Sequence, residues 1–145
     1  MNVYEYFQNI RRMDMKIQNA NNEIKRLTDM MSGIGAVDYA RESIQNGKTE
    51  KEPSFVYKIE QIDEHRRALE QMVERYENYR QKAFERLDIL TPIESRVLYL
   101  RYFEYKNLEA VAAELNYSFF GVRHIYRSAI KRIREQYGEY YGEEI

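Results

Sequence analysis

The chain has 145 residues, with 23 lysines and arginines against 24 aspartates and glutamates, two prolines and no cysteine. This length is typical of one domain, or of a small domain with an extension. The lack of cysteine excludes a disulfide framework and a thiol nucleophile, and the net charge of −1 excludes a uniformly basic nucleic-acid binder.

The sequence also lacks the signs of membrane insertion or export. No apolar run approaches the roughly 20 residues that a membrane helix needs. The opening Met-Asn-Val-Tyr-Glu is not a basic start that leads into an apolar signal core. We therefore expect a cytoplasmic protein with no membrane partner.

The first predicted element is one long amphipathic helix over residues 3–31. Its apolar residues recur at alternating spacings of four and three, which keeps them on one face of a helix. Polar residues such as Arg11, Asn19 and Arg26 occupy the opposite face. The predicted seam consists of Tyr6, Ile10, Met13, Ile17, Ala20, Ile24, Leu27 and Met31.

A polar stretch over residues 32–54 follows and predicts a long, mobile loop. Ser54 is a good cap for a second helix over residues 55–90. Two long helices with matching seams predict an antiparallel hairpin over residues 1–90. Because such a hairpin buries only one side of each helix, we expect it to pair with a second copy or with the C-terminal part. The second seam consists of Phe55, Ile59, Ile62, Arg66, Leu69, Val73, Tyr76, Arg80, Ala83, Leu87 and Leu90.

The segment 91–137 contains three further predicted helices, each with its own start signal. Thr91 and Glu94 form a capping box around a proline at the first helical position, which begins a helix that ends near residue 103. Asn107 caps a short helix over residues 108–115, and Ser118 caps a last helix that ends near residue 137. An acidic tail over residues 138–145 closes the chain.

The spacing within residues 108–127 predicts a helix-turn-helix. Ala112 provides a small side chain where the two helices approach closely. Asn116 occupies a turn position with positive φ, which asparagine tolerates better than most residues. Tyr117 is predicted to tuck the turn against the core. The inward positions hold Val111, Leu115, Val122 and Ile125.

Charge is concentrated on the last helix. Residues 118–134 contain five basic residues and no acidic one. Four of them recur at steps of four, four and three, which predicts one exposed row, and such a concentration indicates phosphate contact. The row consists of Arg123, Arg127, Lys131 and Arg134.

These residues define a candidate DNA-binding site. Arg123 and Arg127 are predicted to contact bases or phosphates, because arginine bonds a guanine edge bidentately. Three further cations are predicted to contact the DNA backbone: Lys131, Arg132 and Arg134. Lys106 is a weaker candidate for a phosphate contact. The outward positions at the start of the last helix are Ser118, Phe119, Phe120, Arg123, His124 and Arg127.

Two features of this site leave alternatives open. Phe119 and Phe120 are candidates for thymine-methyl contacts, for a protein groove or for the core. His124 is interpreted as a polar neighbour of DNA or solvent, because no second metal ligand stands nearby at a suitable spacing. No metal and no cofactor are therefore expected.

The C-terminal third resembles region 4 of primary sigma factors, the part that reads promoters. The resemblance rests on Leu-Thr-Pro-Ile-Glu-Ser-Arg-Val-Leu from residue 90, Leu-Glu-Ala-Val-Ala-Ala-Glu-Leu from residue 108 and Ala-Ile-Lys-Arg-Ile-Arg from residue 129. It implies transcription activation through double-stranded DNA, and contact with RNA polymerase. The sequence departs from sigma factors at Phe119-Phe120-Gly121, where those proteins have charged residues.

The whole arrangement resembles small phage and prophage late-gene regulators of the ArpU/RinA type. Val37-Asp38-Tyr39 in the loop and a second helix that starts near Phe55 carry this second resemblance. It implies a phage late-gene activator.

Three functions follow as hypotheses. The first is a DNA-binding transcription regulator that forms a homodimer through the hairpin. The second is a DNA-packaging protein of the terminase small-subunit type, which assembles as a large ring. The third is an adaptor that binds RNA polymerase or a sigma factor through Phe119 and Phe120. An enzyme is not expected, because the sequence shows no phosphate-binding loop, metal-ligand cluster or serine with a plausible base.

Overall fold

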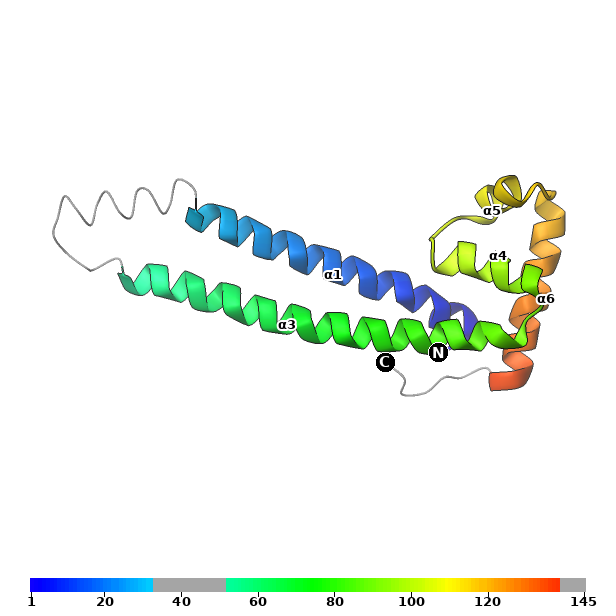
Figure 1. Cartoon of the computed structure of the whole chain (residues 1–145), viewed down its shortest axis with the longest axis horizontal. Helices are drawn as coiled ribbons and strands as arrows, with labels where there is room; N and C mark the ends of the chain where they lie inside the picture. The colour runs from blue at the N-terminus through cyan, green and yellow to red at the C-terminus, as the bar shows by residue number, and fades with distance from the viewer. Residues whose placement is uncertain (33–51, 139–145) are drawn as a thin grey trace. The chain divides into compact units, whose positions relative to one another are not determined.

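The computed structural model describes residues 1–32 and 52–138, and every regular element in these two ranges is helical. This confirms the all-α prediction for the described residues. The predicted mobile loop at 32–54 and the acidic tail at 138–145 lie almost wholly outside them. The elements in chain order are α1 (Val3–Ser32), α3 (Glu52–Glu85), the 3₁₀ turn η1 (Arg86–Ile89), α4 (Pro92–Tyr102), α5 (Leu108–Leu115) and α6 (Phe119–Tyr137) (Figure 1).

The second long helix differs from its prediction at both ends. It begins at Glu52, so Ser54 lies inside its first turn and does not precede the helix as a cap. Pro53 is compatible with this start, because the amides of a first helical turn have no intrahelical partner. The α-helix ends at Glu85, and the chain continues through η1 to Leu90.

The contacts divide the chain into two units. We call Met1–Asp14 together with Arg75–Ile145 the compact unit, and Met15–Glu74 the hairpin unit. Helices α1 and α3 each contribute to both units, and each unit is described by itself. The compact unit joins the first turns of α1 to the C-terminal helices. The sequence predicts a domain boundary at residue 90, and whether the two sides of that boundary fold independently stays a prediction.

The main core of the compact unit is shared by α1, α3, α4 and α6. Phe7 is fully buried and stacks on Tyr102 of α4, with ring centroids 5.2 Å apart. Val3 is fully buried in the same cluster. Neither Val3 nor Phe7 belongs to the predicted seam. The seam was predicted for contact with one partner helix, whereas these two residues also face the C-terminal helices. The cluster contains Val3, Tyr6, Phe7, Ile10, Tyr79, Ala83, Leu87, Leu98, Tyr102, Phe103, Ala129, Ile130 and Ile133.

A second, smaller core holds the helix-turn-helix together. It comprises Val97 and Leu100 from α4, Val111 and Ala112 from α5, and Val122 from α6. Ala112 is 5% exposed, as the prediction of a close helix approach requires. Leu115 and Ile125 pack against this cluster from its edge.

In the hairpin unit, α1 and α3 pack through the predicted seam of α1. Each predicted seam residue of α1 is buried or half-buried, and Arg26 and Asn19 on the opposite face are exposed. The prediction for α3 is wrong at two positions, because Ile59 and Val73 are exposed. Arg66 is exposed as well, which is compatible with an arginine whose stem covers a seam while its charged head stays in water.

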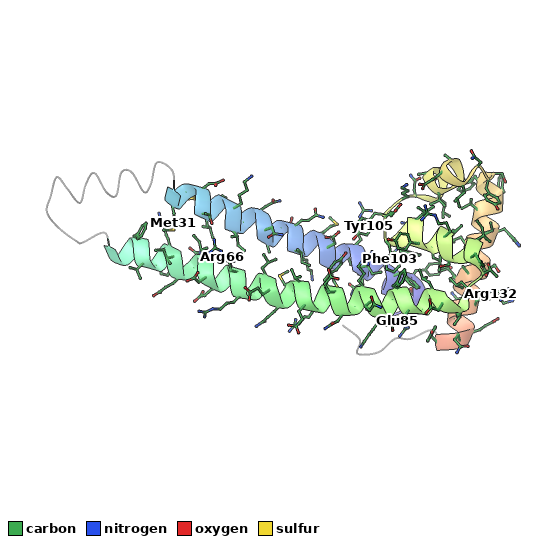
Figure 2. The ribbon with its side chains drawn as sticks, viewed as in Figure 1. Met31, Arg66, Glu85, Phe103, Tyr105 and Arg132 are labelled. Carbon is green, nitrogen blue, oxygen red and sulfur yellow. The ribbon has the colours of Figure 1, made fainter. Side chains whose placement is uncertain are left out.

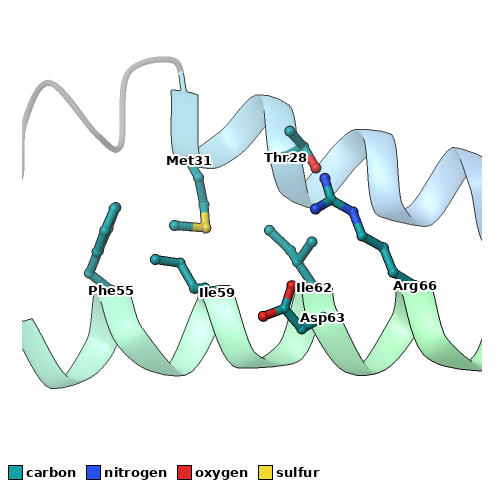
Figure 3. A pocket seen from close by; sticks show the side chains of 7 residues that line it. All are labelled: Thr28, Met31, Phe55, Ile59, Ile62, Asp63 and Arg66. Atoms are coloured by element: carbon teal, nitrogen blue, oxygen red, sulfur yellow. The ribbon is translucent and has the colours of Figure 1, made fainter.

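Side-chain burial is sparse in the hairpin unit. Among its described residues only Leu27 and Ile62 are buried. An open groove of about 320 Å³ lies between the two helices. Figure 3 shows Arg66 extending from α3 toward Thr28 of α1. The groove is lined by Thr28, Met31, Phe55, Ile59, Ile62, Asp63 and Arg66. In the described part of the chain, no helix combines the length and apolarity needed to span a bilayer.

Candidate nucleic-acid interface

The helix that precedes the helix-turn-helix begins with the predicted capping box. The Thr91 side chain accepts a hydrogen bond from the Glu94 amide at 3.3 Å, and the Glu94 carboxylate accepts one from the Thr91 amide at 3.1 Å. Pro92 stands at the first helical position. These contacts satisfy two amides that would otherwise have no intrahelical partner.

The turn between α5 and α6 is closed by backbone groups. Asn116 has φ 58° and ψ 37°, the left-handed conformation predicted for this position. The Tyr117 amide donates to the Ala112 carbonyl at 3.0 Å, as in a helix C-cap of the Schellman type. Tyr117 itself is 48% exposed, so the prediction that its ring tucks against the core is wrong. The backbone closes the turn without it.

Ser118 and Gly121 shape the start of α6 together. The Ser118 hydroxyl accepts a hydrogen bond from the Gly121 amide at 3.0 Å, which confirms the predicted cap. A Cβ atom at position 121 would lie 3.0 Å from the Ser118 Oγ, closer than most real Cβ contacts. A glycine in the first turn therefore leaves space for the capping hydroxyl.

The two phenylalanines at this end of α6 have different surroundings. Phe120 is 74% exposed, whereas Phe119 is half-buried. Their rings meet edge to face with centroids 5.8 Å apart. Phe120 thus presents an apolar ring to solvent at the opening of α6, and Phe119 supports it from the side.

Part of the predicted basic row lies on one open face of α6. Arg123, Arg127 and Lys131 are exposed, and none of them forms an ion pair with a residue that the structure describes. His124 is exposed beside them. The face is therefore a set of uncompensated cations on a helix that begins with an exposed aromatic ring.

Arg132 is tied to the core of the compact unit. Its Nε donates to the Glu94 Oε2 at 3.1 Å, and Glu94 is only 4% exposed (Arg132 is labelled in Figure 2). Burial raises the pKa of Glu94, but hydrogen bonds with Thr91 and Ser128 and the charge of Arg132 outweigh burial and hold it below the usual value. The pair links the start of α4 to the middle of α6. The capping role of Glu94 depends on its near neighbours and can be predicted. Its partner Arg132 stands 38 positions away, and nothing in the sequence indicates that the two residues meet.

Two other predicted cations are less available than expected. Arg134 is half-buried and its Nε is enclosed, so it departs from the exposed row. The Lys106 ammonium contacts Glu114 at 2.7 Å and Glu104 at 3.5 Å. Those carboxylates raise the pKa of Lys106 and neutralise its charge locally.

Tyrosines attach the first turns of α1 to the helix-turn-helix. The Tyr105 hydroxyl donates to the Asp14 carboxylate at 2.7 Å, and Arg11 lies over the Tyr105 ring at 5.6 Å (Tyr105 is labelled in Figure 2). Tyr102 of α4 and Tyr126 of α6 share a short hydrogen bond, and burial raises the pKa of both hydroxyls. Tyr105 has φ 62°, which turns the chain sharply between α4 and α5.

The geometry of the compact unit is that of a helix-turn-helix with one cationic face. Residues 86–135 match the family model of Sigma-70, region 4. The matched range begins at η1, a few residues before the segment whose resemblance was recognised in the sequence, and it ends within α6. It leaves out residues 1–85, whose α1 turns complete the core. The chain matches no curated protein and no solved structure. Within residues 1–32 and 52–138, no three histidine or acidic side chains gather as a metal site.

Proposed function

We propose that the chain is a DNA-binding transcription regulator that reads duplex DNA with α6. The observation that carries this proposal is the open face of Arg123, Arg127 and Lys131, in a unit that is similar to Sigma-70, region 4. Cations without protein partners are free to neutralise phosphates and release counterions. In a helix-turn-helix, the second helix lies in the major groove and its first residues meet the base edges.

The residues of this face divide into two roles. Arg123 and Arg127 stand within the first three turns of α6 and are proposed to contact guanine edges or the adjacent phosphates. Lys131 stands further along the face and is proposed to contact the DNA backbone. The half-buried Arg134, which lies outside the exposed face, is proposed as a further backbone contact. Arg132 is exposed but paired with Glu94, so it is proposed as a weaker contact with the DNA backbone. The other proposed contacts are Ser118, Phe119, Phe120, His124 and Lys106.

Phe120 is proposed to contact thymine methyl groups. Its ring is too exposed to contribute to the core, and an apolar ring in the major groove finds its complement in the methyl group of thymine. Replacement of Phe120 by Ala should leave the unfolding free energy unchanged and weaken binding to sites that carry thymine at the contacted step. Equal weakening at all sequences would contradict this assignment.

The main proposal is tested by fluorescence anisotropy of a labelled duplex across a salt series. The full chain should lose affinity steeply as salt rises, and Arg123→Glu with Arg127→Glu should abolish binding. The matched control is Arg75→Glu with Lys82→Glu, which makes the same change of charge at exposed sites on α3 of the same unit. Equal loss in both double variants would show that net charge, and not the α6 face, governs binding.

The finer identity is a phage late-gene activator that acts as a homodimer and contacts RNA polymerase. An amphipathic hairpin joined to a region-4-like unit supports this proposal, and the cytoplasm is the expected compartment because the duplex and the polymerase lie there. A dimer presents two reading helices and favours paired half-sites. Selection of bound duplexes from a random pool should return such paired sites. A large ring in sedimentation would instead support the DNA-packaging alternative.

The exposed Phe120 also supports a second candidate, an adaptor that binds RNA polymerase or a sigma factor. Exposed aromatic side chains are enriched at the centres of protein interfaces. A folded sample that binds no duplex at low salt but binds polymerase through Phe120 would favour the adaptor. Duplex binding that depends on Arg123 and Arg127 would count against it.

A further inference from the structure

One line of the predicted α3 seam is only partly covered by α1, because Ile59 and Arg66 line the open groove between the two helices. Ile59, Arg66 and Val73 belong to the predicted seam, yet all three are exposed. They stand seven residues apart, so they occupy one heptad position of the helix. Apolar residues that share one heptad position and remain exposed in a single chain are available for a second helix to cover.

A second line of α3 runs beside the first. Val56, Asp63 and Glu70 are also seven residues apart and also exposed. Merged with the first line, they follow alternating spacings of three and four, which is the pattern of a coiled-coil seam. We call the merged set the outer stripe, and it consists of Val56, Ile59, Asp63, Arg66, Glu70 and Val73.

The outer stripe is complementary to its own reverse. When two copies of α3 lie antiparallel with Val56 opposite Val73, Asp63 stands opposite Arg66 and Arg66 opposite Asp63, and Ile59 stands opposite Glu70. The complementarity therefore rests on the Val56–Val73 and Asp63–Arg66 pairs, and Glu70 must keep its carboxylate at the solvent edge of the contact. A two-fold interface has this reciprocity, because residue i meets residue j and j meets i. A parallel pair in register would set Asp63 opposite Asp63 and Glu70 opposite Glu70, which is repulsive.

We propose that the outer stripe is the contact between two copies of this chain, which pair antiparallel about a two-fold axis near Glu64 and His65. The Val56–Val73 contacts bury apolar side chains at both ends, where Val56 is 48% and Val73 38% exposed in the single chain. The two Asp63–Arg66 pairs flank the axis. A polar pair at seam positions fixes register and orientation at some cost in stability.

The composition of the hairpin unit favours a second copy as the occupant. With Leu27 and Ile62 as its only buried side chains among the described residues, the pair of helices has little core of its own. Pairing two such hairpins gives each α3 a second helix to pack against. Ile59, Asp63 and Arg66 line the open groove of Figure 3 between α1 and α3, so a second copy would reach them from the open side of that groove.

The proposal specifies the homodimer of the proposed function and does not depend on DNA binding. Sedimentation of the full chain without DNA should show a dimer. Asp63→Arg sets like charges opposite one another twice and should weaken the dimer by at least about tenfold. Arg66→Asp should do the same, and the double variant Asp63→Arg with Arg66→Asp should restore the dimer.

A matched control separates the register from net charge. Glu64→Arg makes the same charge change at the next, exposed position, which lies outside the outer stripe. It should leave the dimer essentially intact. Weakening equal to that of Asp63→Arg, or failure of the double variant to restore the dimer, would overturn the proposed register.

Orientation is tested by cross-linking, because the chain has no cysteine of its own. Mixed under oxidation, the Val56→Cys and Val73→Cys variants should form a disulfide between unlike chains. Val56→Cys alone should not cross-link, and if it does, the helices are parallel and the proposal is wrong. A monomeric chain that still binds duplex DNA through α6 would overturn this contact and leave the DNA-binding proposal intact.

Discussion

The Tyr79 hydroxyl of α3 donates a 2.7 Å hydrogen bond to the main-chain carbonyl of Tyr6 in α1. The two rings also pack with centroids 5.1 Å apart, and Tyr79 is only 2% exposed. A tyrosine hydroxyl that reaches a helix carbonyl fixes how two helices turn relative to each other. This contact therefore sets the packing of α1 against α3 inside the compact unit.

Replacing Tyr79 by Phe removes only that hydroxyl. We expect the free energy of unfolding to fall by about 1 kcal/mol, which is typical of a lost buried hydrogen bond. Urea unfolding followed by circular dichroism measures the change. Tyr57→Phe is the control, because Tyr57 is 65% exposed. An equal loss in both variants would show that the Tyr79–Tyr6 bond is not responsible.

The first turns of α1 are needed for the helix-turn-helix to fold. Phe7 is fully buried against Tyr102 in the cluster that also contains Ile130 and Ile133. Phe7→Ala should destabilise the chain by about 3–5 kcal/mol, as large cavities in cores do. Gln8→Ala, at an exposed position, should change little. A fragment of residues 86–138 should show no cooperative thermal transition, and a stable fragment would contradict this prediction.

The Glu94 carboxylate should make stability depend on pH. Its pKa is lowered in the folded chain, so its contribution is present above the ordinary value of 4.5 and is lost as pH falls through the folded value. Glu94→Gln should cost about 1–2 kcal/mol at neutral pH and converge with the parent chain in acid. Chemical unfolding at a series of pH values measures this. Glu109→Gln changes an exposed site, so its unfolding free energy should vary with pH in the same way as that of the parent chain.

The left-handed turn at Asn116 should respond to substitution in a fixed order. Alanine resists φ 58°, so Asn116→Ala should lower the unfolding free energy by about 1 kcal/mol. Asn116→Gly should be neutral or stabilising, because glycine adopts this conformation without steric cost. Thermal unfolding of both variants gives the order, and a less stable glycine variant would show that the asparagine side chain contributes in another way.

Local signals in the sequence predicted local structure well. Thr91, Asn107 and Ser118 each accept a hydrogen bond from the amide three residues on, as their positions before a helix predict. The conformation of Asn116 follows from the same kind of short-range reasoning. These features depend on a few neighbouring residues, so no knowledge of the tertiary structure is needed to find them.

Contacts between segments that are distant in the chain could not be predicted from the sequence. Tyr79 is buried because α1 packs over it. The spacing of residues on α3 does not show that Tyr79, and not Tyr76, is the more deeply buried of the two tyrosines. The Glu94–Arg132 pair joins two helices, and a sequence shows the charges but not their meeting. A seam pattern likewise cannot tell how completely the partner helix covers it, which is why Ile59 and Val73 were expected to be buried but are exposed. The roles of the α6 cations toward DNA stay predictions.

The chain leaves the compact unit at Asp14 and re-enters it at Arg75. In the terms of domain architecture, residues 15–74 are an insertion between two segments that build a single core. Insertions of this kind tolerate changes of length better than the core that surrounds them. Removal of one heptad from each helix should therefore change the proposed contact between two copies and leave α6 folded. In such an architecture, the proposed contact between copies is free to diverge while the unit that we propose binds DNA stays the same.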